Sequence, residues 1–274
     1  MTIGEAQRQS TLMKACGRII VSTWVVGTLG FGSVAVAQSP SPELARCLTH
    51  LADNPDAVLA QAEEWTRHGG GLAAGECAAL AQMERGEVAD AARRFDALAL
   101  ARAEGHTVSA GDPQAEVIAA FYANAARAWL QVHQTASAAS SARAGLAWSP
   151  QDLVLSTLLA RAQCDEGQYA ASLQTLGALP RTGKDLSDAY TLRAADRRHM
   201  NDIAGGLKDV ETALDLAPDN VGALLERGIL HARQGALGPA RDDWDRVIAL
   251  SPDTHDAYLA RQDEDVLAAD PDQP

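Results

Sequence analysis

The chain has 274 residues, enough for one or two ordinary domains or one repeat array, and 47% of them are hydrophobic. Only 4% are aromatic, and much of the apolar fraction is alanine, which suits closely packed helices better than a β-sandwich or barrel. The formal net charge of −13 at pH 7 excludes nucleic acid as the main partner, because phosphate binding needs a basic face.

Residues 1–37 differ in composition from the rest of the chain. Two basic residues, Lys14 and Arg18, precede an apolar run without charge at 19–36. An A-x-A site ends the segment at 35–37. This order predicts a cleaved secretory signal peptide, and hence a periplasmic or secreted protein of a Gram-negative cell envelope. An uncleaved anchor is the alternative, since about 18 apolar residues can span a bilayer. Met13 is a second candidate for the true start.

Residues 38–71 predict a divergent helical hairpin. Pro42 can open its first helix, Asn54-Pro55 separates the two helices, and three glycines at 69–71 end the second one.

Three cysteines remain after the predicted cleavage. Cys47 and Cys77 fall on neighbouring predicted helices. In an oxidising compartment we expect them to form a disulfide, and two buried thiols are the alternative. Cys164 is expected to be a lone, packed thiol.

Residues 72–103 predict another helix–turn–helix unit, with Ala79 and Ala91 as small residues on its two helices. The corresponding small residue of the next unit is Ala126. The units after it repeat every 34 residues, but the distance from Ala79 to Ala126 along the sequence is longer than 34 residues. The sequence therefore predicts an insertion near 104–118.

The stretch 119–254 repeats with a 34-residue period through four units, which are 119–152, 153–186, 187–220 and 221–254. The recurring small residues are Ala126, Ala160, Ala194 and Gly228, then Ala138, Ser172, Gly206 and Ala240. The turns fall at His133, Gly167, Asn201 and Gly235. Glycine and asparagine tolerate the left-handed conformation that ends a helix, so the histidine is the exception.

The end of the array departs from the regular pattern in two places. In the unit 153–186 the early Pro180 predicts a short second helix. Residues 255–269 predict a capping helix with a polar outer face, which an open array needs to stay soluble. Residues 270–274 are expected to be disordered.

A 34-residue period with two small positions twelve apart resembles the tetratricopeptide repeat (TPR), a helix–turn–helix unit. The resemblance implies an all-α fold, a right-handed α-solenoid of TPR-like repeats, with five units in 72–254. The late tyrosine position of the family's first helix departs from the pattern and holds Gln82, Trp129, Gln163, Arg197 and His231.

The resemblance also implies that the first helices line a concave groove that binds a protein or peptide segment. The groove residues would be Asn124, Arg127, Gln131, Thr157, Arg161, Asp165, Thr191, Arg198 and Leu225. Arg127 and Arg161 occupy the same place in consecutive units, so they can present two guanidinium groups to a carboxylate. Ordinary solvated arginines are the alternative.

No constellation in the sequence predicts catalysis, a cofactor or a metal site. The seven histidines lack metal-ligand spacing, and the His-Gly-Gly-Gly at 68–71 is not followed by a G-x-S-x-G nucleophile motif. We expect a non-catalytic protein–protein interaction scaffold or adaptor in the cell envelope. One alternative is a non-catalytic subunit of an envelope complex anchored in the inner membrane, and a less favoured one is a hydrolase with an unrecognised site.

Overall fold

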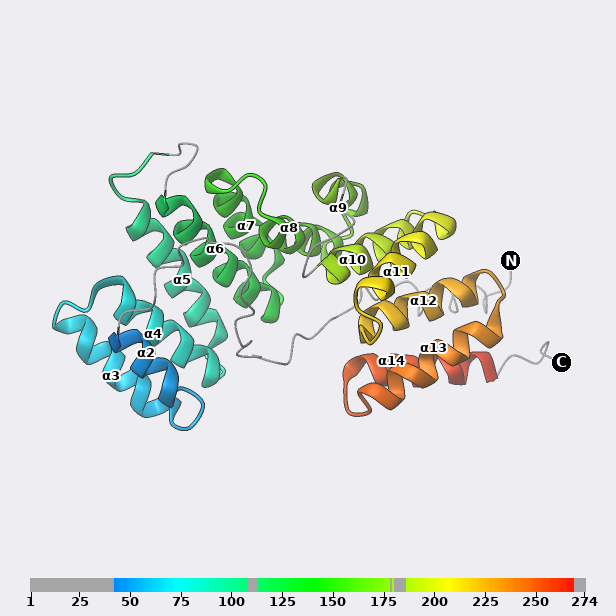
Figure 1. Ribbon diagram of the computed structural model, residues 1–274, viewed down its shortest axis with the longest axis horizontal. Coiled ribbons are helices and arrows are strands. Elements are labelled where there is room, and N and C mark those ends of the chain that lie inside the picture. Colours follow the sequence, from blue (N-terminus) through cyan, green and yellow to red (C-terminus); the bar gives the residue numbers. More distant parts are fainter. Residues whose placement is uncertain (1–41, 108–112, 178, 180–185, 269–274) are drawn as a thin grey trace. The chain divides into compact units, whose positions relative to one another are not determined.

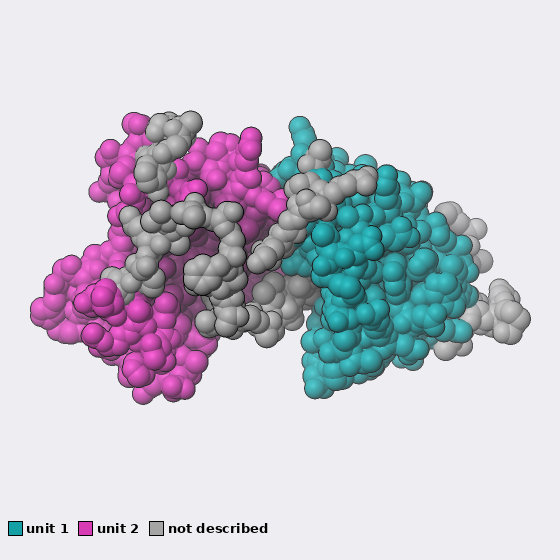
Figure 2. All heavy atoms as spheres, viewed as in Figure 1, with its two compact units in different colours: residues 1–21, 163–274 teal, residues 22–162 magenta. Residues whose placement is uncertain are grey.

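The computed structural model describes residues 42–107, 113–177, 179 and 186–268, which form thirteen helices and no strand (Figure 1). The chain divides into two compact units at the Ala162–Gln163 bond (Figure 2). The expected signal peptide at 1–37 and the expected tail at 270–274 lie outside the described residues. Within the described ranges, no helix is long and apolar enough to cross a membrane.

In unit 2 each helix from α3 to α6 packs against the next one along the chain. The helices are α2 (Pro42–His50), α3 (Pro55–Arg67), α4 (Gly71–Glu84), α5 (Val88–Ala103), α6 (Pro113–Gln131), α7 (Thr135–Trp148) and most of α8 (Leu153–Asp165). Large side chains from successive helices meet in one core, among them Phe95, Ile118, Phe121 and Leu155. Stacking therefore buries apolar faces that a single hairpin would leave exposed.

The insertion expected near 104–118 is partly helical. The helix α6 begins at Pro113 and has 19 residues, which suits a proline because its missing N–H would be unpaired in the first turn. Ile118, near the end of the expected insertion, is fully buried. Residues 108–112 lie outside the described residues.

The N-terminal hairpin is joined covalently to the first repeat. The Asn54 side chain caps α3 by accepting a hydrogen bond from the Ala57 N–H at 3.1 Å. The predicted disulfide between Cys47 on α2 and Cys77 on α4 is present, with Cα atoms 6.1 Å apart. Cys164 is also disulfide-bonded. The expectation of a lone thiol is therefore wrong.

Unit 1 contains the end of α8 and six further helices in its described part. They are α9 (Tyr169–Leu176), α10 (Leu186–His199), α11 (Ile203–Leu216), α12 (Val221–Arg233), α13 (Leu237–Leu250) and α14 (His255–Ala268). The short second helix expected in the unit 153–186 is α9, which has 8 residues where α11 and α13 have 14.

The turns and small positions follow the 34-residue period. His133 and Asn201 are the two non-glycine residues with positive φ in the described part of the chain, at 57° and 63°. Gly167 and Gly235 have φ of 74° and 79°, so all four turns end a helix in the left-handed conformation. The alanines at the small positions are fully buried, at 126, 138, 160, 194 and 240.

Polar pairs stand where the family's late tyrosine is missing. In three repeats the residue at this position contacts a residue twelve further along, on the second helix of the same repeat. The pairs are Gln82 Oε1 with Arg94 Nε at 2.9 Å, Gln163 Oε1 with the Thr175 hydroxyl at 2.7 Å, and Arg197 Nε with Asp209 Oδ2 at 3.2 Å. Hydrogen bonds thus hold the two helices together where an aromatic ring would otherwise pack.

Candidate protein-interaction surface

The first helix of the second repeat carries a paired asparagine and arginine. On α6 the Arg127 Nη1 donates a hydrogen bond to Asn124 Oδ1 at 2.9 Å. Both side chains are half-buried, and burial lowers the pKa of Arg127. In the described part of the chain no carboxylate pairs with this guanidinium.

An arginine in this state is unusual for a stable protein surface. Arginines are mostly exposed or paired, because a charge taken out of water needs compensation. The amide oxygen of Asn124 supplies one acceptor, while a guanidinium carries five N–H donors. The α6 surface around Arg127 can therefore accept an anionic group with bidentate hydrogen bonds.

The other groove positions of α6 and α8 are accessible to different degrees. Gln131 and Asp165 are exposed, and Arg161 is half-buried at the position equivalent to Arg127. Thr157 is half-buried, and its hydroxyl donates to the Leu153 carbonyl oxygen at 2.7 Å within α8. The structure brings Asn124 and Arg127 into direct contact.

Three of the expected groove residues are buried, and the expectation that they line an open groove is wrong. Thr191, Arg198 and Leu225 are exposed by 5%, 1% and 3%. The Thr191 hydroxyl donates to the Ser187 carbonyl oxygen at 2.9 Å. Arg198 donates instead to Glu226 on α12. These side chains hold unit 1 together because neighbouring helices cover them.

The Arg198–Glu226 pair belongs to a larger charged cluster that sequence analysis missed. Arg233 on α12 donates through Nη1 to the backbone carbonyl oxygen of Arg198 at 2.9 Å. Asp263 on α14 also belongs to this cluster. Burial is the main cause that raises its pKa to about 6; Arg198 opposes the shift and Glu226 adds to it.

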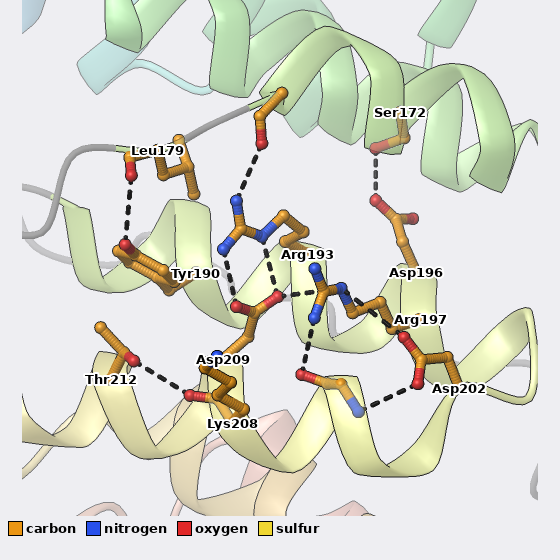
Figure 3. Close-up of polar contacts among 12 residues, drawn as sticks. Ser172, Leu179, Tyr190, Arg193, Asp196, Arg197, Asp202, Lys208, Asp209 and Thr212 are labelled. Atoms are coloured by element: carbon orange, nitrogen blue, oxygen red, sulfur yellow. Dashed lines mark hydrogen bonds and ion pairs between the residues drawn. The ribbon is translucent and has the colours of Figure 1, made fainter.

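A second set of ion pairs recurs with the repeat. Arg193 on α10 makes two hydrogen bonds to Asp209 on α11, at 2.8 and 2.7 Å, and Figure 3 shows this fork. Arg227 on α12 makes the same fork to Asp243 on α13, at 2.9 and 2.5 Å. The two pairs occupy equivalent positions in consecutive repeats, so the period itself could have revealed them.

The 34-residue spacing of the buried small residues and of the left-handed turns agrees with a known repeat family. Two family models described as tetratricopeptide repeat match residues 130–195 and 198–263. The chain is a tetratricopeptide repeat protein. Such repeats are stacked interaction modules that present extended binding surfaces, so this TPR protein is a protein-interaction scaffold.

A curated relative of this TPR protein is human Tetratricopeptide repeat protein 36. The two are 31% identical over 90 residues, which cover 31% of this chain and 48% of the relative. The TPR protein thus spans about half the length of the curated relative it matches.

Solved structures share the fold of this TPR protein. It is similar to the C-terminal part of a TPR repeat-containing protein from Cytophaga hutchinsonii, with a TM-score of 0.54 and 11% identity over 84% of this chain and 96% of that one. It is also similar to a double mutant of MamA RS-1, with a TM-score of 0.50 and 17% identity over 64% and 90% of the two chains. Among the residues described, no group of three or more His, Cys, Asp or Glu side chains in this TPR protein could hold a metal ion.

Proposed function

We propose that this protein binds a carboxylate-bearing segment of a partner protein through helices α6 and α8, as a non-catalytic scaffold in the bacterial cell envelope. The observation that carries the proposal is the half-buried Arg127, which has Asn124 as its hydrogen-bond partner. Arg161 lies at the equivalent position on α8 and offers a second guanidinium.

The Arg127 guanidinium is already partly desolvated before a partner protein binds. Burial has removed part of its hydration, which is the cause of its lowered pKa. A carboxylate that arrives there therefore displaces little water and forms charge-assisted hydrogen bonds, each worth about 1.5–3 kcal/mol. An aspartate, a glutamate or a free carboxy terminus of a partner has this chemistry.

The proposed location rests on the composition of residues 1–37. The order of basic residues, apolar run and A-x-A site supports export. N-terminal sequencing of the protein purified from a periplasmic fraction tests this part, and we expect Gln38 as the first residue. A purified chain that still begins before 19–36 and sediments with membranes would favour the anchored alternative.

The binding proposal is tested by substituting both arginines. The double variant Arg127→Gln with Arg161→Gln should lose at least about tenfold in affinity for a partner that crosslinks to α6 or α8 in envelope extracts, as mapped by mass spectrometry. Arg143→Gln is the matched control, because this arginine is exposed on α7. If the double variant captures the same partner as well as the control does, the assignment of the surface is wrong.

A further inference from the structure

A pocket of about 500 Å³ opens between α10 and α11 in unit 1. Its size is within the range of ligand-binding pockets, but charged and polar groups make up most of its lining. The lining includes Tyr190, Arg193, Arg197, Lys208, Asp209 and Asp215.

The pocket lies where a helix ends early. The helix α9 stops at Leu176 after 8 residues. Beyond this point two side chains of α10 reach the main chain, because Arg193 Nη1 donates to the Gly177 carbonyl oxygen at 2.9 Å and the Tyr190 hydroxyl donates to that of Leu179 at 3.3 Å. The second helix of the next repeat, α11, has 14 residues.

Arg193 and Asp209 serve the structure and do not by themselves indicate a ligand. Their fork recurs one repeat later as Arg227 with Asp243, where it joins α12 to α13. The hydrogen bonds to Asp209 are the main cause that raises the pKa of Arg193. The Nε, Nη1 and Nη2 atoms of Arg193 each donate a hydrogen bond.

Two further cations line the pocket: Arg197, which contacts the same Asp209, and Lys208, which takes no part in the fork. Arg197 and Lys208 stand where the next repeat has His231 and Asp242 at the equivalent positions. Replacing a histidine and a carboxylate by an arginine and a lysine makes the α10–α11 pocket more positive than its counterpart.

Both cations have donors that the described residues leave available. The Nε of Arg197 lies 3.2 Å from Asp209 Oδ2 and 3.9 Å from Asp202 Oδ2 (Figure 3). Its Nη1 donates to the Gly205 carbonyl oxygen at 3.0 Å. Within the described ranges the Nη2 group of Arg197 has no acceptor. The side chain of Lys208 is exposed, and no described carboxylate forms an ion pair with its ammonium group.

From this geometry we infer that the α10–α11 pocket binds an acidic segment of a partner protein. The Arg197 Nη2 group and the Lys208 ammonium hold its side-chain carboxylates. The lining contributes three cations and two carboxylates on a chain whose net charge is −13. The inference concerns unit 1 and stands without the proposed role of Arg127.

The test uses the full chain and a fluorescein-labelled hexaglutamate peptide, with the hexaglutamine peptide as the uncharged reference. Fluorescence anisotropy at low salt should show binding of the glutamate peptide, and the affinity should fall as salt is raised. The double variant Arg197→Gln with Lys208→Gln should bind about tenfold more weakly. The matched control is Arg241→Gln with Arg246→Gln, which removes two exposed charges from α13 and should bind like the wild type.

Several outcomes would overturn the inference. One is an Arg197→Gln and Lys208→Gln variant that melts like the wild type and binds the glutamate peptide equally well. A second is equal binding of the two peptides. A third is complete displacement by inorganic phosphate, which would make the pocket a site for small free anions. Because the proposed α6 surface can also bind a carboxylate, the comparison is repeated with Arg127→Gln present in every protein. The loss caused by Arg197→Gln with Lys208→Gln should persist in that background, and its disappearance would place the acidic peptide on the α6 surface instead.

Discussion

Arg198 donates two hydrogen bonds to Glu226, from Nε to Oε1 at 2.6 Å and from Nη2 to Oε2 at 3.2 Å. The two side chains are exposed by 1% and 4%, and they join α10 to α12, the first helices of adjacent repeats. Because the two charged groups are removed from water, only the opposite charge and the neighbouring protein groups can replace their lost hydration. The stability of unit 1 should therefore depend on keeping both partners or neither.

Substituting one partner alone should destabilise unit 1 strongly. Arg198→Met leaves the Glu226 carboxylate buried without its guanidinium, and we expect a loss of about 3–5 kcal/mol in the free energy of unfolding. The double variant Arg198→Met with Glu226→Leu removes both charges and should recover most of that loss. Urea unfolding followed by circular dichroism measures both. A double variant no more stable than Arg198→Met would contradict this account.

The pKa of Asp263 predicts how stability changes with pH. Burial raises this pKa from its ordinary value of 3.8 to about 6 in the folded protein, so the folded state binds the proton more tightly than the unfolded state. The stabilising contribution is complete below about pH 4 and is lost as pH rises through 6. Above pH 6 the charged carboxylate on α14 lies close to Glu226, and Arg198 compensates it in part.

The variant Asp263→Asn should therefore isolate the contribution of Asp263 to the pH dependence of stability from that of the other titratable groups. The amide stays neutral, so the variant should be more stable than the wild type at pH 7.5, by an amount on the order of 1–3 kcal/mol. The difference should shrink towards zero as pH falls from 6 to 4. Unfolding curves of the two proteins at matched pH values give the difference directly. A difference that does not change with pH would show that Asp263 is not the group responsible.

The sequence predicts the repeat frame of this fold well, because the frame depends on local rules. A left-handed turn at Gly235 and close helix approach at Ala126 follow from residue size and period alone. The disulfide was expected from two cysteines on neighbouring predicted helices together with the predicted export to an oxidising compartment. The open or buried state of a groove position does not follow in this way.

Arg198 shows why groove positions could not be predicted reliably. Like Arg127 it lies on the first helix of a repeat, but Glu226 on the first helix of the next repeat supplies it with a buried carboxylate. Whether an arginine faces solvent thus depends on a residue in the next repeat and on α14, neither of which the period specifies. The α10–α11 pocket was missed although Pro180 predicts a short second helix, because the period does not specify which side chains of α10 and α11 line the space between them.

The disulfide should hold α2 against the first repeat. The double variant Cys47→Ala with Cys77→Ala removes a link between positions whose sequence separation is 30, and chain entropy predicts a loss of about 3–4 kcal/mol. The effect should be confined to the N-terminal end of unit 2. Hydrogen exchange measured by mass spectrometry should show lost protection in α2 and unchanged protection in α6 and α7. Full protection of α2 in the variant would show that apolar packing alone holds this helix.

At the small position Gly228, helix α12 lies directly against Trp244 of α13. A Cβ atom at Gly228 would lie 2.3 Å from Trp244 Nε1 and 2.7 Å from its Cδ1. The tryptophan is 1% exposed, so its ring has little room to move. Alanine would gain about 1 kcal/mol in helix propensity, but overpacking costs about 1–3 kcal/mol, and we expect Gly228→Ala to be destabilised on balance.

Gly238 on α13 supplies the control for this substitution. A Cβ atom there would have no neighbour within 4 Å, so Gly238→Ala gains helix propensity without overpacking. The two variants should therefore move the midpoint of urea unfolding in opposite directions. If Gly228→Ala is as stable as Gly238→Ala, the indole of Trp244 moves aside, and the small position in this repeat does not require glycine.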